Sequence, residues 1–81
     1  MAKAKFSPEY RRLCALLVRA RESAGLRQAD VAERLSKPQS YVSKVELGER
    51  RLDVLEFIEF ARAIDADPIR IIKAVSKEQP H

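Results

Sequence analysis

Residues 28–48, with the sequence QADVAERLSKPQSYVSKVELG, limit the folds open to this chain more than any other stretch. In the first part, Ala32 and Leu35 are three positions apart and form one apolar face with Val31. Pro38 disfavours helical geometry at Lys37 and itself suits the first turn of a new helix. We therefore expect one helix to end near Leu35 and another to begin near Pro38, with a tight turn between them.

The second helix of this stretch has two different faces. Val42 and Val45 are three positions apart and are expected to face inward, and Gly48 is suited to closing the helix. The opposite face carries polar side chains without a carboxylate, namely Gln39, Ser40, Ser43 and Lys44. Glutamine can bind adenine through two hydrogen bonds, lysine can contact guanine or phosphate, and serine can contact either. Such a face suits a nucleic-acid surface, although an ordinary solvated face has a similar composition.

The length of 81 residues allows a single domain. With one cysteine, Cys14, the monomer has no disulfide framework, and we expect a buried and inert thiol. No cysteine and histidine cluster could hold zinc, and the chain lacks a paired acid and base, an activated nucleophile and a phosphate-binding glycine loop. The sequence therefore predicts no enzyme activity, no catalytic residue, no metal, no cofactor and no small-molecule ligand.

No apolar run approaches membrane-spanning length, and the N-terminal residues do not resemble a signal peptide, so a cytoplasmic location without membrane contact is expected. The net charge of +4 is unevenly distributed. Residues 1–27 carry seven basic and two acidic groups, residues 28–52 carry five and four, and residues 53–81 carry four and six. The basic half of the chain holds the proposed nucleic-acid face, while the acidic half can turn away from phosphates.

Three further segments begin with helix-start signals. Ser7 can cap a helix that starts with a proline, and apolar residues then recur at helical spacing up to Gly25. Asp53 and Glu56 form a D-x-x-E capping arrangement, and Asp67 is followed by a proline. The chain is thus expected to be all-α, with a five-helix domain over residues 8–76 and a tail at 77–81. Residues 1–7 are expected to form a basic arm that either frays or orders on a DNA groove.

The last of these helices has more apolar groups than a monomer needs. Ile69 and Ile72 are expected to reach the core together, whereas Ile71 and Val75 point elsewhere at i,i+4 spacing. Surplus apolar side chains on a terminal helix indicate a partner. We therefore expect a two-fold homodimer through Ile71 and Val75, to which the exposed side of the preceding helix could contribute.

The segments GLRQADVAERL and PQSYVSKVELGERR resemble the Cro/C1-type (XRE-like) helix-turn-helix family of prokaryotic and phage DNA-binding transcriptional regulators. The resemblance extends over about residues 10–73 and includes FARAI at 60–64, which precedes Asp67. It implies a compact five-helix lambda-repressor-like domain whose second and third helices form the helix-turn-helix. It also implies a repressor that binds double-stranded DNA sequence-specifically as a homodimer on a palindromic operator.

The resemblance assigns roles to side chains on and near the third helix, which would enter the major groove. Base contacts are expected from Gln39, Ser40, Tyr41, Ser43 and Lys44. Contacts or attraction to the phosphate backbone are expected from Arg27, Gln28, Lys37, Arg50 and Arg51. For the loop at 49–51, simple solvation is the alternative.

The resemblance also implies a partly buried ion pair between Arg21 and Glu46 that ties the first helix to the third; two solvated charges are the alternative. The sequence departs from the family pattern at two positions. Arg27 stands where serine or threonine often caps the second helix, so this chain lacks that side-chain cap. Ser36 stands where glycine commonly makes the turn, so the turn either avoids a strongly left-handed residue or accepts a modest strain.

Two other functions fit a domain of this kind. A helix-turn-helix module can serve in protein–protein docking, since a fold alone does not establish function. A docking face would be expected to expose aromatic or aliphatic anchors, which the outer face of the third helix lacks. The chain could also be the antitoxin or controller component of a two-gene system, and the residues do not distinguish that role from a phage-type repressor.

Overall fold

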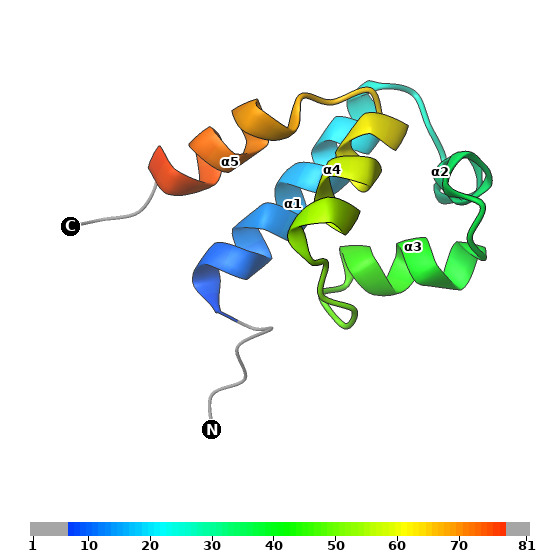
Figure 1. Cartoon of the computed structure of the whole chain (residues 1–81), viewed down its shortest axis with the longest axis horizontal. Coiled ribbons are helices and arrows are strands. Elements are labelled where there is room, and N and C mark those ends of the chain that lie inside the picture. The colour runs from blue at the N-terminus through cyan, green and yellow to red at the C-terminus, as the bar shows by residue number, and fades with distance from the viewer. Residues whose placement is uncertain (1–6, 78–81) are drawn as a thin grey trace.

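The computed structural model describes residues 7–77, which form five α-helices. These are α1 (Pro8–Ser23), α2 (Gln28–Leu35), α3 (Gln39–Glu46), α4 (Val54–Ala63) and α5 (Pro68–Lys77). Figure 1 shows α5 at one end of the molecule and α2 with α3 at the other, with α1 and α4 between them. The all-α, five-helix prediction is confirmed. Apart from Ser7 and Lys77, the expected arm and tail lie outside the described residues.

Local sequence signals set most helix ends. The side chain of Ser7 accepts a hydrogen bond from the backbone N–H three residues later, at 3.2 Å. Asp53 and Glu56 each accept a hydrogen bond from the backbone N–H of the other, at 2.7 and 3.0 Å, as expected for a capping box. Near the C-terminal ends of α1 and α3 lie Gly25 and Gly48, whose φ angles of 75° and 81° are left-handed and suit glycine.

The turn between α2 and α3 is built on a left-handed serine. Ser36 has φ 56° and ψ 44°, and its backbone N–H donates to the carbonyl of Glu33 at 3.1 Å. The next backbone N–H, from Lys37, donates to the carbonyl of Ala32 at 3.0 Å, which completes a Schellman-type ending. Of the two expectations for Ser36, the turn with modest strain is the one observed.

The hydrophobic core lies where the five helices meet. Its largest fully buried side chains are Phe60, Leu17, Ile64, Val31, Val42 and Val45. Burial of each such side chain is worth about 1.5–3 kcal/mol. Cys14 is also buried, and its Sγ lies 3.5 Å from the carbonyl oxygen of Val45. Burial raises the pKa of the Cys14 thiol, which fits the inert role expected from the sequence.

The expected orientation of α5 is wrong. Ile71 is buried in the core with 8% of its surface exposed, whereas Ile69 and Ile72 are 62% and 48% exposed. α5 packs against α1 and α4, and the side of the helix that carries Ile71 faces them. Ile71 is therefore a core residue and is not available for a dimer interface, and Val75 is half-buried on the monomer.

Candidate nucleic-acid interface

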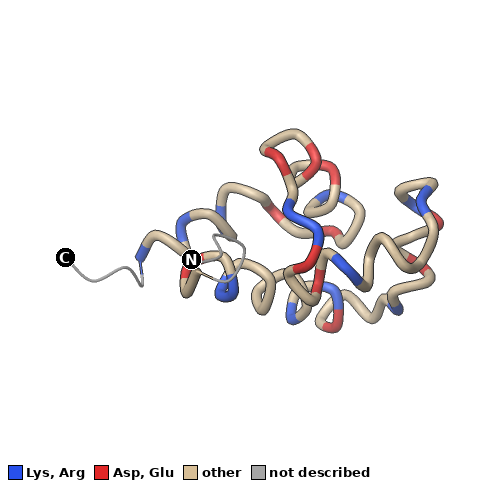
Figure 2. Tube along the Cα trace, turned by 90° about the horizontal axis from the view of Figure 1, so that it is seen from below, with Lys and Arg blue, Asp and Glu red and all other residues tan. Residues whose placement is uncertain are grey.

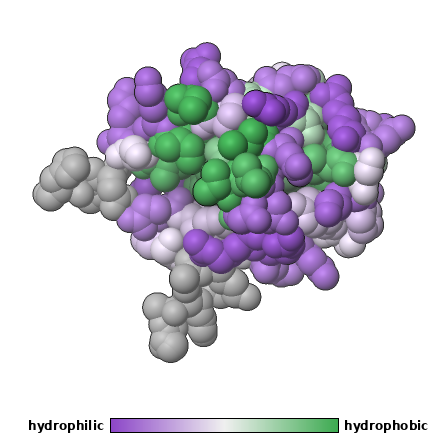
Figure 3. Space-filling view, in the orientation of Figure 1, coloured by the Kyte–Doolittle hydropathy of each residue, from purple (hydrophilic) through white to green (hydrophobic). Residues whose placement is uncertain are grey.

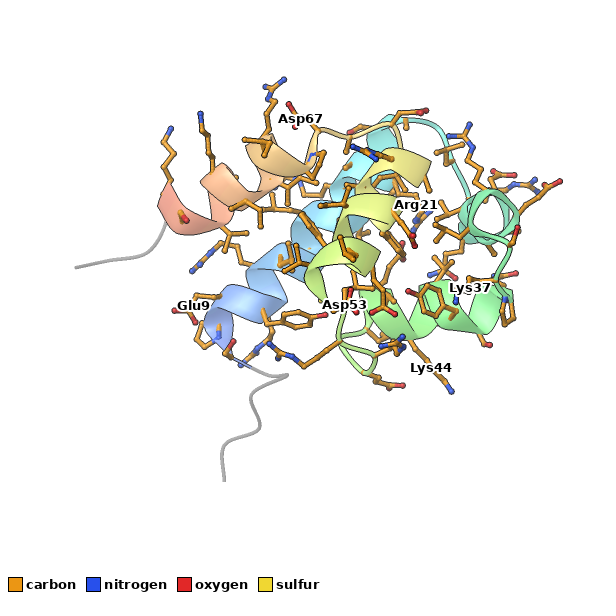
Figure 4. All side chains as sticks on the ribbon, viewed as in Figure 1. Glu9, Arg21, Lys37, Lys44, Asp53 and Asp67 are labelled. Atoms are coloured by element: carbon orange, nitrogen blue, oxygen red, sulfur yellow. The ribbon has the colours of Figure 1, made fainter. Side chains whose placement is uncertain are left out.

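The α3 helix presents a polar outer face because its two valines are fully buried. Val42 and Val45 each have 0% exposure and hold α3 against the core. On the other side Gln39, Ser40 and Lys44 are exposed. Figure 4 shows Lys44 pointing away from the body of the molecule. The remaining two expected base-contacting residues, Tyr41 and Ser43, are half-buried at the edges of this face.

The single carboxylate of α3 is turned inward and neutralised. Glu46 Oε2 lies 2.6 Å from Arg21 Nε, and Glu46 Oε1 lies 3.2 Å from Arg21 Nη2. The two side chains are 6% and 13% exposed, and Arg21 Nη1 also donates to the carbonyl of Leu26 at 2.8 Å. The structure thus contains the ion pair that the resemblance implied, and the pair ties α1 to the back of α3. It also removes the negative charge of α3 from the surface.

Gln28 connects this ion pair to the outer face. Gln28 Nε2 donates to Glu46 Oε1 at 2.8 Å, and Gln39 Nε2 donates to Gln28 Oε1 at a longer 3.4 Å. Gln28 is the first residue of α2 and Gln39 the first of α3, so the turn brings the two helix starts together. Sequence reasoning assigned these glutamines to separate contacts. Their connection was missed because it follows from the angle between α2 and α3, which no local pattern records.

Arg27 precedes α2 and is held there by Asp30. The Arg27 side chain makes no cap, but Asp30 Oδ2 accepts from the backbone N–H of Arg27 at 2.8 Å. Arg27 Nη2 also lies 2.9 Å from Asp30 Oδ1. The hydrogen bonds from the Arg27 side chain and backbone lower the pKa of Asp30 to about 2. The Arg27 side chain remains 81% exposed beside the start of α2.

Two basic side chains lie over the ring of Tyr41. Lys37 Nζ is 5.1 Å and Arg50 Cζ is 5.4 Å from the ring centroid. Arg50 Nη2 also pairs with Glu56 Oε2 at 2.7 Å. Burial raises the pKa of Tyr41, and the charge of Glu56 adds to this effect, so the phenol stays protonated at neutral pH. The sequence singled out Glu56 only as a helix cap, and its contact with Arg50 depends on the path of the loop.

The loop after α3 is anchored to α1. Arg51 Cζ lies 4.2 Å from the ring centroid of Tyr10, and the Tyr10 hydroxyl accepts a hydrogen bond from the backbone N–H of Leu52 at 3.2 Å. Figure 2 shows a short basic stretch in this loop with acidic positions on either side. Arg50 and Arg51 are exposed, but each has an aromatic contact, so this loop is more constrained than a simply solvated one.

Neither a metal centre nor a membrane span is found in the part of the chain that the structure describes. Within residues 7–77, no three histidine, cysteine or acidic side chains are grouped in a way that could hold a metal ion. The helices over the same range are all too short or too polar to cross a membrane.

Comparisons with known proteins agree with this geometry. A family profile described as helix-turn-helix matches residues 17–71. A solved structure, an XRE-family like protein from Pseudomonas syringae pv. tomato str. DC3000, is 46% identical in sequence and superimposes with a TM-score of 0.85. The match covers 89% of this chain and 88% of that one. Comparison with curated protein sequences gave no match.

Proposed function

The chain belongs to the Cro/C1-type helix-turn-helix family of DNA-binding regulators, and from this premise we propose that it binds double-stranded DNA sequence-specifically through α3 in the major groove. One observation carries the proposal. The only carboxylate of α3, Glu46, is turned inward and paired with Arg21, so the exposed face of the helix repels no phosphate. The family consists of regulators and not of enzymes, which agrees with the absence of a catalytic arrangement in the sequence.

The proposed base contacts come from the exposed side chains of α3. Gln39, Ser40 and Lys44 project furthest and are assigned to base edges, where glutamine suits adenine and lysine suits guanine. Tyr41 and Ser43 lie deeper and are assigned to bases or the adjacent backbone. The proposed phosphate contacts come from residues that flank α3, namely Arg27, Gln28 with the N-terminus of α2, Lys37, Arg50 and Arg51.

Selection of bound duplexes from a random-sequence pool at near-physiological salt tests this proposal. The parent should enrich a defined site, and Gln39→Ala should cost about 1–3 kcal/mol and relax the preference at one base pair. Arg50→Ala should instead weaken binding to all duplexes similarly. It should also reduce the slope of log K against the logarithm of the salt concentration by about one. If nothing is enriched, and weak binding disappears on addition of salt, specific recognition is refuted.

We further propose a homodimer, through a different surface from the one expected. Four large apolar side chains of α4 and α5 are exposed, Val54, Leu55, Ile69 and Ile72, and we name them the α4–α5 surface. Figure 3 shows hydrophobic residues gathered over α4 and towards α5. Three of the four also line a groove of about 630 Å³ whose rim holds both basic and acidic residues, Arg51, Asp53, Arg62 and Asp67. A second copy related by a two-fold axis could bury the apolar groups and pair opposite charges.

Such a dimer would place two copies of α3 about one DNA turn apart, roughly 34 Å, and so require an approximate palindrome. A dimer bound over a promoter would exclude polymerase, which is the repressor role that we propose. Sedimentation of the parent should show a dimer, and Ile69→Glu should give a folded monomer. Ala15→Glu, which changes an exposed position of α1 outside the groove, is the matched control. A parent that sediments as a monomer at tens of micromolar contradicts the dimer.

A further inference from the structure

We infer that Leu47, the residue that closes α3, determines specificity by contacting the C5-methyl group of a thymine. The inference rests on the proposed function, because it requires α3 to lie in the major groove. Three observations carry it: the exposure of the Leu47 side chain, its position on the same face as two of the proposed base-contacting residues, and the chemistry of the base edges.

Leu47 is the exposed apolar residue that the proposed dimer does not explain. Within residues 7–77 five large apolar side chains are exposed, and four of them form the α4–α5 surface. The fifth, Leu47, has 65% of its surface exposed and lies outside both the core cluster and the groove on the α4–α5 surface. A single exposed leucine is ordinary on most protein surfaces, so its role here depends on where it lies.

The backbone places the Leu47 side chain on the outer face of α3. Leu47 has φ and ψ angles of −80° and −6°, and its backbone N–H donates to the carbonyl four residues earlier at 3.0 Å, so it continues the helical turn. Ser40, Lys44 and Leu47 follow one another at spacings of four and three, and such positions share one face of an α-helix. The chain turns away only at Gly48, whose φ angle is 81°. Leu47 therefore projects on the same side as Ser40 and Lys44.

The length of α3 keeps this end of the face within the groove. The eight residues of α3 span about 12 Å, at about 1.5 Å per residue. The major groove of B-DNA is also about 12 Å wide and admits an α-helix. When α3 lies in the groove, its last turn is thus close to base edges as well as its first.

The base edges offer one apolar group to such a side chain. In the major groove the bases present hydrogen-bond donors and acceptors, and thymine adds its C5-methyl group. Leucine can neither donate nor accept, so its contact with a donor or acceptor would remove water from that group without replacing the hydrogen bond. Contact with the methyl group instead buries apolar surface on both sides. Thymine is therefore the base that Leu47 fits.

Deoxyuridine tests this contact, because it lacks the C5-methyl group of thymine and keeps the same hydrogen-bond donors and acceptors. The site obtained by selection is synthesised as a series of duplexes in which one thymine at a time is replaced by deoxyuridine, and Kd is measured for each. With the parent chain, replacement at one position should weaken binding about 2- to 4-fold, since the lost interaction is the burial of one methyl group.

Two substitutions of Leu47 assign the effect to this residue. With Leu47→Ala, deoxyuridine at that position should leave Kd unchanged, because the methyl group has already lost its partner. Leu47→Met is the matched control, because it keeps an apolar side chain of similar size, and it should retain the effect of deoxyuridine. Leu47 is exposed, so both variants should fold like the parent, which circular dichroism checks.

An effect of deoxyuridine that is equal in the parent and in Leu47→Ala overturns the inference and leaves the proposed function intact. The absence of any such effect in the parent, or a selected site without thymine, also overturns it. If Leu47→Ala weakens the thymine and deoxyuridine duplexes by the same factor, Leu47 meets the sugar-phosphate backbone and reads no base. If selection enriches no site, the proposed function fails, and the inference fails with it.

Discussion

Replacing Glu46 by alanine removes the contact that holds α3 against α1. The substitution leaves the Arg21 guanidinium, 13% exposed, with the carbonyl of Leu26 at 2.8 Å, and it removes the acceptor of Gln28. Breaking a buried ion pair by removing one partner costs about 3–5 kcal/mol. Because Arg21 has some access to water, we take the lower end, about 3 kcal/mol. In a domain of this size that loss lowers Tm by roughly 12–24 °C.

Thermal unfolding followed by circular dichroism at neutral pH measures this change. The melts should be compared at several protein concentrations, because a dimer makes Tm depend on concentration. Arg21→Met combined with Glu46→Met is the control, since an apolar pair in the same place should recover much of the loss and show strong non-additivity. A Glu46→Ala variant that melts within a degree of the parent refutes the reasoning.

Three further predictions concern the turn, the start of α2 and the orientation of α5. Ser36→Gly should raise the free energy of unfolding by about 0.5–1 kcal/mol in urea denaturation, because it relieves a left-handed conformation, and an unchanged midpoint would contradict this. The pKa of Asp30 is about 2 in the folded chain against an ordinary value of 3.8, so its stabilising effect is present above pH 4 and is lost as the pH falls towards 2. The difference in Tm between the parent and Asp30→Asn should shrink over that range, and a constant difference would exclude this origin. Ile71→Ala should cost about 2–5 kcal/mol in chemical denaturation, whereas a cost near zero would mean that Ile71 lies outside the core.

The helix boundaries could be predicted from the sequence because each depends on residues within one turn. Ser7 caps α1 through a hydrogen bond to a backbone group three residues away, and Asp53 and Glu56 cap α4 over the same spacing. Gly25 and Gly48 follow helices because their φ angles are left-handed. The valines of α3 could also be assigned to the core, since this helix has a single apolar stripe. The face expected to meet DNA followed from that assignment.

The tertiary structure decided which of two apolar stripes on α5 is buried. Ile69 with Ile72 and Ile71 with Val75 both recur at helical spacing, so periodicity alone defines two candidate faces. Only the positions of α1 and α4 determine that the side of Ile71 packs inward and leaves Ile69 and Ile72 in water.

The same distinction applies to the interface. The types of side chain on the outer face of α3 are a property of the sequence, whereas the contacts of Gln28 with Glu46 and of Arg50 with Glu56 join residues 18 and 6 positions apart. Contacts of this kind depend on where whole helices and loops lie, because a hydrogen bond forms only when the distance between donor and acceptor is correct to within a few tenths of an ångström. The sequence by itself therefore determined the five helices and the polar face of α3. Packing decided the dimer surface that we propose and the contacts that join Gln28 to Glu46 and Arg50 to Glu56.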